Sequence, residues 1–99
     1  MVLDRVGLTG ATGMLGRHIQ TAFENSSVDI LPVSRLSNNP STKWDLGKWL
    51  NSEELDNMFS SVQAIIHAGA FVQTSGEINQ ERMFNVNVRA CLNLGQWAL

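Results

Sequence analysis

The feature that most constrains this chain is a turn with three glycines, Gly10, Gly13 and Gly16, in the stretch LTGATGMLG of residues 8–16. An apolar segment precedes it and apolar residues at helical spacing follow it, which predicts strand, turn and helix. Gly10 allows the tight turn, Gly13 lets backbone approach a pyrophosphate, and Gly16 lets helix and strand pack closely. The helix N-terminus then offers unpaired N–H groups and the positive end of its dipole. A turn without a ligand is the alternative, but three spaced glycines exceed what a turn requires.

The rest of the chain alternates predicted strands and helices. Apolar and β-branched runs predict strands at residues 2–8, 28–33, 42–46 and 62–67. Helical spacing of apolar residues predicts helices at residues 15–24, after Asn51, and from about residue 78 to the end. Asn51 and Glu54 resemble a capping box, and Pro32 requires a bulge or an unpaired side in the second strand. This alternation predicts an α/β fold with a parallel sheet and crossover helices.

Four stretches carry a resemblance to a known family. Residues 9–16, TGATGMLG, resemble the TGxxGxxG fingerprint of the short-chain dehydrogenase/reductase superfamily, and the ending Leu15-Gly16 is most similar to its extended branch of epimerases, dehydratases and reductases. Asp45-Leu46 resembles the pair of residues, one of them acidic, that follows the third strand in the family. Residues 65–70, IIHAGA, resemble the fourth strand and its turn. Residues 87–94, NVRACLNL, are similar to the helix NVxGTxNL, with Ala90 and Cys91 in place of Gly and Thr.

The resemblance spans residues 2–94 and implies a Rossmann-like parallel sheet of strand order 3-2-1-4. It implies that residues 1–99 are the N-terminal part of a dinucleotide-binding domain. These residues would end before the fifth strand of that domain. The cofactor-binding residues implied by the glycine turn and the resemblance together are Gly10, Thr12, Gly13, Met14, Leu15, Gly16, Ser34, Arg35, Asp45, Leu46, His67, Ala68, Gly69, Ala70 and Asn87.

The end of the second strand discriminates between the two nicotinamide cofactors. An acidic residue there binds the ribose 2′-hydroxyl of NAD, whereas an arginine accepts the 2′-phosphate of NADP. Here the strand ends Pro32-Val33-Ser34-Arg35, and Asp29 lies too early. The sequence therefore favours NADP, with NAD as the alternative. Arg35 as a solvated surface cation is the other interpretation.

Three of the implied residues also have structural interpretations. Asp45 precedes a glycine and can be a turn residue, as aspartate often is. His67 ends a buried strand and can be a neutral histidine satisfied by backbone. Asn87 can be a polar residue on a helix surface. No residues have metal-ligand spacing, and no nucleophile lies beside a base.

The catalytic residues that the resemblance implies are missing from these 99 residues. The family uses a tyrosine with a lysine four residues later, but the chain has no tyrosine and its lysines are Lys43 and Lys48. We expect the NAD(P)-binding portion of an oxidoreductase, epimerase or dehydratase that acts by hydride transfer on a nucleotide sugar or small carbonyl or hydroxyl substrate. The 99-residue chain alone is expected to be inactive. The alternatives are a non-catalytic NADP-sensing module that regulates a protein partner and a fragment that binds nothing.

Composition bears on partners and location. The net charge is −2 without a basic stripe, which argues against nucleic acid, and no apolar run is long enough for a membrane. The single Cys91 and the lack of a leader favour the cytoplasm.

The fourth strand would leave an apolar edge, and the last helix would leave an uncovered face, which carries Phe84, Val88, Cys91, Leu92 and Leu94. Such a chain is expected to be marginally stable, to aggregate, or to form a homo-oligomer through the last helix.

Overall fold

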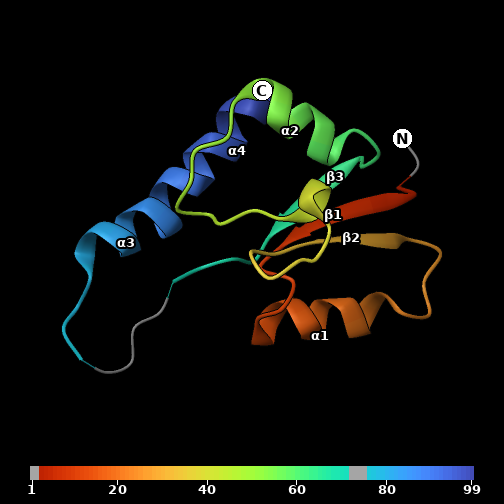
Figure 1. Cartoon of the computed structure of the whole chain (residues 1–99). Helices are drawn as coiled ribbons and strands as arrows, with labels where there is room; N and C mark the ends of the chain where they lie inside the picture. Colours follow the sequence, from red (N-terminus) through yellow and green to blue (C-terminus); the bar gives the residue numbers. More distant parts are fainter. Residues whose placement is uncertain (1–2, 72–75) are drawn as a thin grey trace.

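The computed structural model describes residues 3–71 and 76–99, and these form a three-layer α/β arrangement around a small parallel sheet (Figure 1). The strands are β1 (Arg5–Thr9), β2 (Asp29–Val33) and β3 (Ala64–His67). The helices are α1 (Met14–Phe23), α2 (Ser52–Phe59), α3 (Gln80–Phe84) and α4 (Ala90–Ala98), with a 3-10 helix at Pro40–Thr42 and a π-helical segment at Asn85–Arg89. The predicted α/β fold is confirmed.

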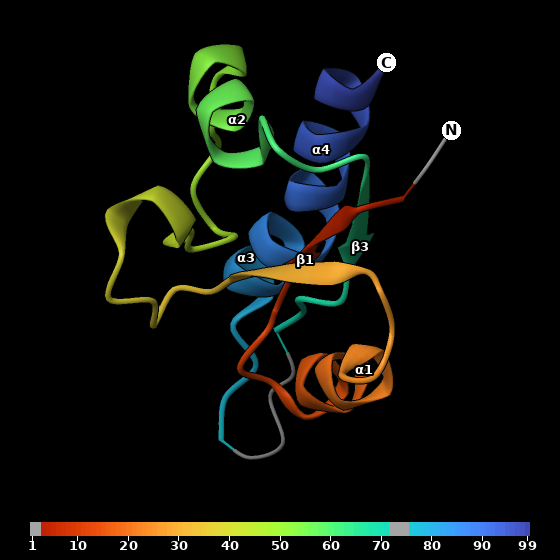
Figure 2. The ribbon, with the colours of Figure 1, turned by 90° about the vertical axis from the view of Figure 1, so that its right-hand side faces the viewer.

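The sheet order is β2-β1-β3, and both strand pairs are parallel, with Gly7 opposite Leu31 on one side and Ile65 on the other. Helix α1 covers one face, and α2 and α4 cover the other, as Figures 1 and 2 show from two directions. Strand β2 is an edge strand with Pro32 exposed, so this proline has the unpaired side that it requires. Strand β3 forms the other edge, and all four of its residues are half-buried.

The predicted third strand at residues 42–46 is wrong. Pro40 begins a 3-10 helix whose N-cap, Asn39, accepts a hydrogen bond from the Ser41 amide at 3.0 Å. Only Lys43 reaches the sheet, through a single parallel bridge to Ser34 next to the end of β2. The order 3-2-1-4 is therefore present as 2-1-4, with the third position reduced to that bridge.

The core lies between the sheet and the α2–α4 layer. Its buried residues are Val33, Trp44, Leu50, Leu55, Phe59 and Leu94. Asn51 and Glu54 form the predicted capping box at the start of α2. The opposite layer is thinner, because only Gly16 of α1 is buried. The helical spacing of Leu15, Ile19, Ala22 and Phe23 predicts one buried face, but Leu15 and Ala22 are exposed.

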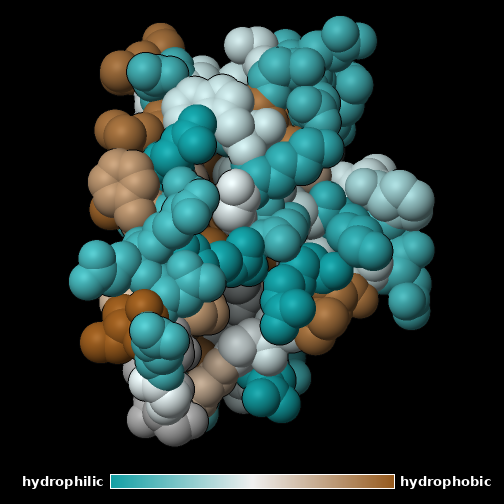
Figure 3. Space-filling model, turned by 60° about the vertical axis from the view of Figure 1, so that its left-hand side comes forward, coloured by the Kyte–Doolittle hydropathy of each residue, from teal (hydrophilic) through white to brown (hydrophobic). Residues whose placement is uncertain are grey.

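The long helix predicted from about residue 78 begins at Gln80 and is interrupted by the π-helical segment. Val86, Ala90 and Leu94 are buried, whereas Phe84, Val88 and Leu92 are exposed. The predicted apolar face of this helix is therefore largely solvent-facing. Figure 3 shows a mainly hydrophilic surface with hydrophobic side chains along its left edge and a smaller group of them on the right.

Candidate functional site

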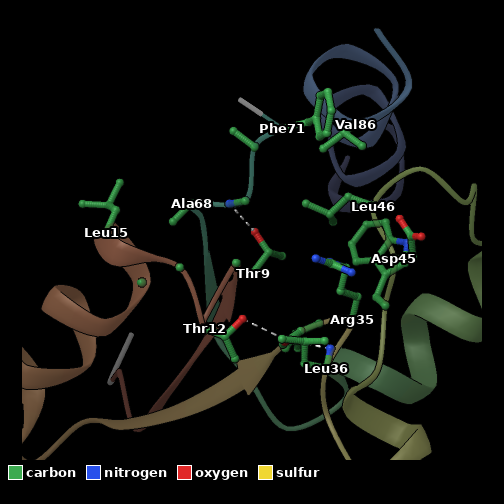
Figure 4. Close-up of a pocket in the computed structure, with 18 of the residues that line it drawn as sticks. Thr9, Thr12, Leu15, Arg35, Leu36, Asp45, Leu46, Ala68, Phe71 and Val86 are labelled. Atoms are coloured by element: carbon green, nitrogen blue, oxygen red, sulfur yellow. Dashed lines mark hydrogen bonds between the residues drawn. The ribbon is translucent and has the colours of Figure 1, made fainter. Parts of the chain in front are cut away.

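A groove of about 820 Å³ lies at the carboxyl ends of the three parallel strands. Its walls are the turn after β1, the segment after β2, the loop around Asp45, and the segment after β3 (Figure 4). Helix α1 follows β1 on one face of the sheet, while the chain leaving β2 goes to the other face. The groove therefore occupies the position beside β1 where the connections change sides, which is where α/β proteins bind ligands.

The glycine turn forms one side of this groove. Gly10 has φ +66°, a left-handed conformation that favours glycine, and a Cβ there would overlap the backbone of Gly69. A Cβ at Gly16 would overlap the carbonyl of Gly10. A Cβ at Gly13 would meet only Gly10 O, at 3.4 Å, so packing does not require glycine at this position. The missing side chain instead leaves space in the groove that Gly13 lines.

The N-terminus of α1 is open toward the groove. Gly13 is the N-cap residue, no side chain accepts a hydrogen bond there, and the first turn has no acidic residue. Met14, Leu15 and Gly16, the first residues of the helix, all line the groove. The free N–H groups and the dipole of this helix end therefore face the place where an anion fits.

Ser34 and Arg35 follow β2 and line the groove as predicted. The Ser34 hydroxyl is buried, accepts a hydrogen bond from Leu36 N at 2.9 Å, and lies 3.2 Å from Thr12 Oγ1. Arg35 is exposed, and Figure 4 shows its guanidinium pointing into the open space between Thr9 and Asp45. Within residues 3–71 and 76–99, Arg35 makes no ion pair.

Asp45 lies across the groove from the glycine turn. Its Oδ1 accepts a hydrogen bond from Gly47 N at 2.9 Å, as a turn residue does, and pairs with Arg82 Nη1 at 2.9 Å. The hydrogen bond from Gly47 and the nearby Arg82 and Arg35 lower the pKa of Asp45 despite its partial burial. Leu46 packs so closely on Gly69 that a Cβ at that glycine would overlap its side chain.

His67 does not line the groove. Its Nδ1 lies 2.6 Å from Thr9 Oγ1, and that hydroxyl also accepts a hydrogen bond from Gly69 N at 3.3 Å. Burial lowers the pKa of His67, and its Nε2 has no hydrogen-bond partner among the described residues. His67 thus supports the turn of Ala68, Gly69 and Ala70, which does line the groove.

Asn87 also lies outside the groove lining. Its amide binds both backbone groups of Phe71, with Oδ1 accepting from N at 2.7 Å and Nδ2 donating to O at 3.0 Å. Asn87 sits in the π-helical segment, a type of distortion that often aims a side chain at a functional site. It therefore holds the segment after β3 in place beside the groove.

The structure brings together thirteen of the fifteen predicted site residues, all except His67 and Asn87. The groove residues that sequence reasoning missed are Thr9, Val33, Leu36, Trp44, Phe71, Arg82 and Val86. Phe71 directly follows the turn at residues 68–70, so extending that motif by one residue would have included it. Arg82 had no such signal, because it comes from α3.

Within residues 3–71 and 76–99, no three His, Cys, Asp or Glu side chains are placed to hold a metal ion. No helix in that part of the chain combines the length and apolar character needed to cross a membrane.

Comparison with solved structures finds the same fold in other proteins. A short-chain dehydrogenase/reductase superfamily protein from Agrobacterium tumefaciens with bound NAD is 23% identical over 95% of this chain and 28% of its own, with a TM-score of 0.71. A hypothetical dTDP-4-dehydrorhamnose reductase from Sulfolobus tokodaii is 22% identical over 95% of this chain and 34% of its own, with a TM-score of 0.72. A uronate dehydrogenase mutant from Agrobacterium tumefaciens complexed with NAD is 23% identical over 96% of this chain and 36% of its own, with a TM-score of 0.64.

These likenesses establish the fold, and the chain spans about a third of the length of these structures. No curated protein sequence matches the chain. The model of the NAD dependent epimerase/dehydratase family matches residues 6–99, which is nearly the whole chain and includes every predicted site residue. The protein therefore belongs to the NAD-dependent epimerase/dehydratase family, as the glycine turn and the three further stretches predicted.

Proposed function

We propose that this chain is the N-terminal, dinucleotide-binding part of an NADP-dependent oxidoreductase, epimerase or dehydratase that acts on a nucleotide sugar or a small carbonyl or hydroxyl compound. The observation that carries the proposal is the uncapped N-terminus of α1, which faces the groove at the carboxyl ends of the strands. The bound nicotinamide would supply hydride transfer, and the chain's own residues bind and orient it. The sugar-derived names of two similar enzymes support the substrate class.

The glycine turn fits a pyrophosphate. The backbone N–H groups at the start of α1 are the donors, and the missing side chain at Gly13 lets the phosphates approach them. Gly10 and Gly16 have a different task, since a Cβ at either would overlap backbone. They shape the turn, and Gly13 keeps it accessible.

The segment after β2 fits a 2′-phosphate better than a 2′-hydroxyl. Arg35 brings a cation without an ion-pair partner among the described residues, and the Ser34 and Thr12 hydroxyls lie beside it. Neither Ser34 nor Arg35 is acidic, so the carboxylate that would repel the phosphate is missing at this strand end. This charge pattern supports NADP over NAD.

Titration calorimetry with NADP and NAD tests the binding site. A valine at Gly13 fills the space above the helix N-terminus, so Gly13→Val is expected to abolish detectable binding of both dinucleotides. Gly95→Ala is the matched control, because a Cβ at Gly95 has nothing within 4 Å and lies outside the groove. Unchanged binding by a folded Gly13→Val protein would contradict the pyrophosphate site.

The same titration tests the cofactor preference. Arg35→Ala removes the cation offered to the 2′-phosphate and is expected to weaken NADP binding about tenfold while changing NAD binding little. Ser34→Asp places the NAD-type acid and is expected to reverse the preference. Tighter binding of NAD than of NADP by the wild-type protein would reject the NADP assignment but not the dinucleotide site.

A further inference from the structure

An ion pair joins two walls of the groove that are far apart in the sequence. Arg82 Nη1 of α3 lies 2.9 Å from Asp45 Oδ1 in the loop after the 3-10 helix. The Arg82 side chain is two-thirds buried, with 32% of its surface exposed, whereas half of the Asp45 side chain is exposed. The Arg82 guanidinium also lies over the Phe71 ring, 5.8 Å from its centroid. Arg82 therefore has a fixed position rather than a solvated one.

Gly47 provides the space for this pair. A Cβ at Gly47 would overlap Arg82 Nη1 and come within 3.4 Å of Arg82 Cζ. Gly47 N also donates to the Asp45 oxygen that Arg82 contacts. The φ of Gly47 is not positive, so the position needs glycine for room and not for backbone conformation. The loop is thus shaped around the arginine.

The pair decides which charge the groove presents. Asp45 and Arg35 line the same groove, and both charges interact, since Arg35 contributes to the lowered pKa of Asp45. Without Arg82, the ionised Asp45 would attract Arg35 and repel an anionic ligand. With Arg82 in place, the negative charge of the Asp45 carboxylate is balanced by the guanidinium. Arg35 then has no ion-pair partner within residues 3–71 and 76–99.

We propose that Arg82 is a positioning residue for cofactor selectivity, which acts by neutralising Asp45 so that Arg35 stays available to a 2′-phosphate. The inference rests on the proposed function, because it concerns the same groove. Arg82 itself touches Asp45 and Phe71, and its effect on the dinucleotide passes through the Asp45 charge. The chemical class that this arrangement selects is a dinucleotide with a phosphate on the adenosine ribose.

Binding of NADP and NAD to five proteins by calorimetry tests the inference: wild type, Arg82→Gln, Gly47→Ala, Asp45→Asn and the double variant Arg82→Gln/Asp45→Asn. Arg82→Gln is expected to weaken NADP binding about tenfold and NAD binding by less than about threefold. Gly47→Ala is expected to shift the ratio in the same direction, although it changes no charge, because its methyl group displaces the guanidinium. If Arg82 acts through the Asp45 charge, Arg82→Gln is expected to weaken NADP binding by less than about threefold when it is introduced into Asp45→Asn, so the double variant is compared with the Asp45→Asn single variant.

Arg89→Gln is the matched control, since Arg89 lies over the Trp49 ring, 5.4 Å from its centroid, and outside the groove. It should leave the NADP to NAD affinity ratio unchanged. If Arg82→Gln weakens both dinucleotides equally, or if it weakens NADP binding as much in the Asp45→Asn background as in the wild type, Arg82 has only a structural role and the inference is wrong. A wild-type protein that binds neither dinucleotide overturns the proposed function and the inference together, whereas an unchanged ratio in folded variants overturns the inference alone.

Discussion

Asn93 of α4 binds the backbone of Leu50 through both ends of its side-chain amide. Asn93 Oδ1 accepts from Leu50 N and Asn93 Nδ2 donates to Leu50 O, each at 2.8 Å. Asn93 is 3% exposed and Leu50 is 5% exposed, so neither backbone group has water as a substitute partner. One amide thus satisfies a residue that belongs to no helix or strand, and it ties α4 to the segment that leads into α2.

Replacing this amide should destabilise the fold. Asn93→Leu leaves the buried N–H and carbonyl of Leu50 without partners, and we expect a loss of about 2–4 kcal/mol in the free energy of unfolding. Urea denaturation followed by circular dichroism measures it. Gln96→Leu, on the exposed side of the same helix, should change the free energy by less than about 0.5 kcal/mol. Equal stability of the two variants would show that the Asn93 amide is dispensable.

Two glycines in helices should respond to alanine in opposite directions. Gly16→Ala forces a methyl group against the Gly10 carbonyl and the Ala11 backbone, so the turn must open, and we expect a loss of about 2 kcal/mol or more. Gly95→Ala meets nothing within 4 Å and should stabilise α4 by about 0.5–1 kcal/mol. Thermal melts of both variants check the signs, and a stabilised Gly16→Ala protein would contradict the close packing at this turn.

Local patterns account for what the sequence predicted well. The glycine turn, the Asn51–Glu54 capping box and the alternation of strands with helices depend on residues within a few positions of each other. The groove residues after β1, β2 and β3 followed, because parallel strands bring their carboxyl ends to one edge of a sheet.

The failures involve partners that no local pattern reveals. Residues 42–46 have strand-like composition, but Asn39 caps a 3-10 helix that begins at Pro40. The side chain of Trp44 then packs in the hydrophobic core. Asn87 was matched to a site residue by motif, yet its amide is used by the Phe71 backbone. Arg82 joins the groove only because α3 folds back on the Asp45 loop, across a separation that sequence spacing does not report.

The buried His67 should make stability depend on pH. Thr9 Oγ1 lies 2.6 Å from Nδ1 and also accepts a hydrogen bond from Gly69 N, so the imidazole is held among neutral partners. Because burial lowers the pKa of His67, the unfolded chain binds a proton more readily than the folded one. Its contribution to stability is complete above pH 6.5 and is lost as the pH falls from there through the folded-state pKa.

We therefore expect the melting temperature of the wild-type protein to fall between about pH 7.5 and about pH 5, and to fall less in His67→Gln. His18→Gln, on the exposed surface of α1, is the control and should follow the wild type. A His67→Gln protein whose melting temperature varies with pH as much as that of the wild type would assign the dependence to other groups.

The exposed apolar residues of the last helical stretch should drive self-association. Phe84 and Leu92 are each 54% exposed and Val88 is 42% exposed, and apolar side chains gathered in this way usually mark an interface. We expect the protein to be larger than a monomer by light scattering, and Val88→Lys/Leu92→Lys to shift it toward the monomer because two charges would have to be buried in the contact. Ala22→Lys adds charge at an exposed position of α1, on the opposite face of the sheet from this helix, and should leave the mass unchanged. A wild-type protein that stays monomeric at all accessible concentrations would contradict the expected association through this helix.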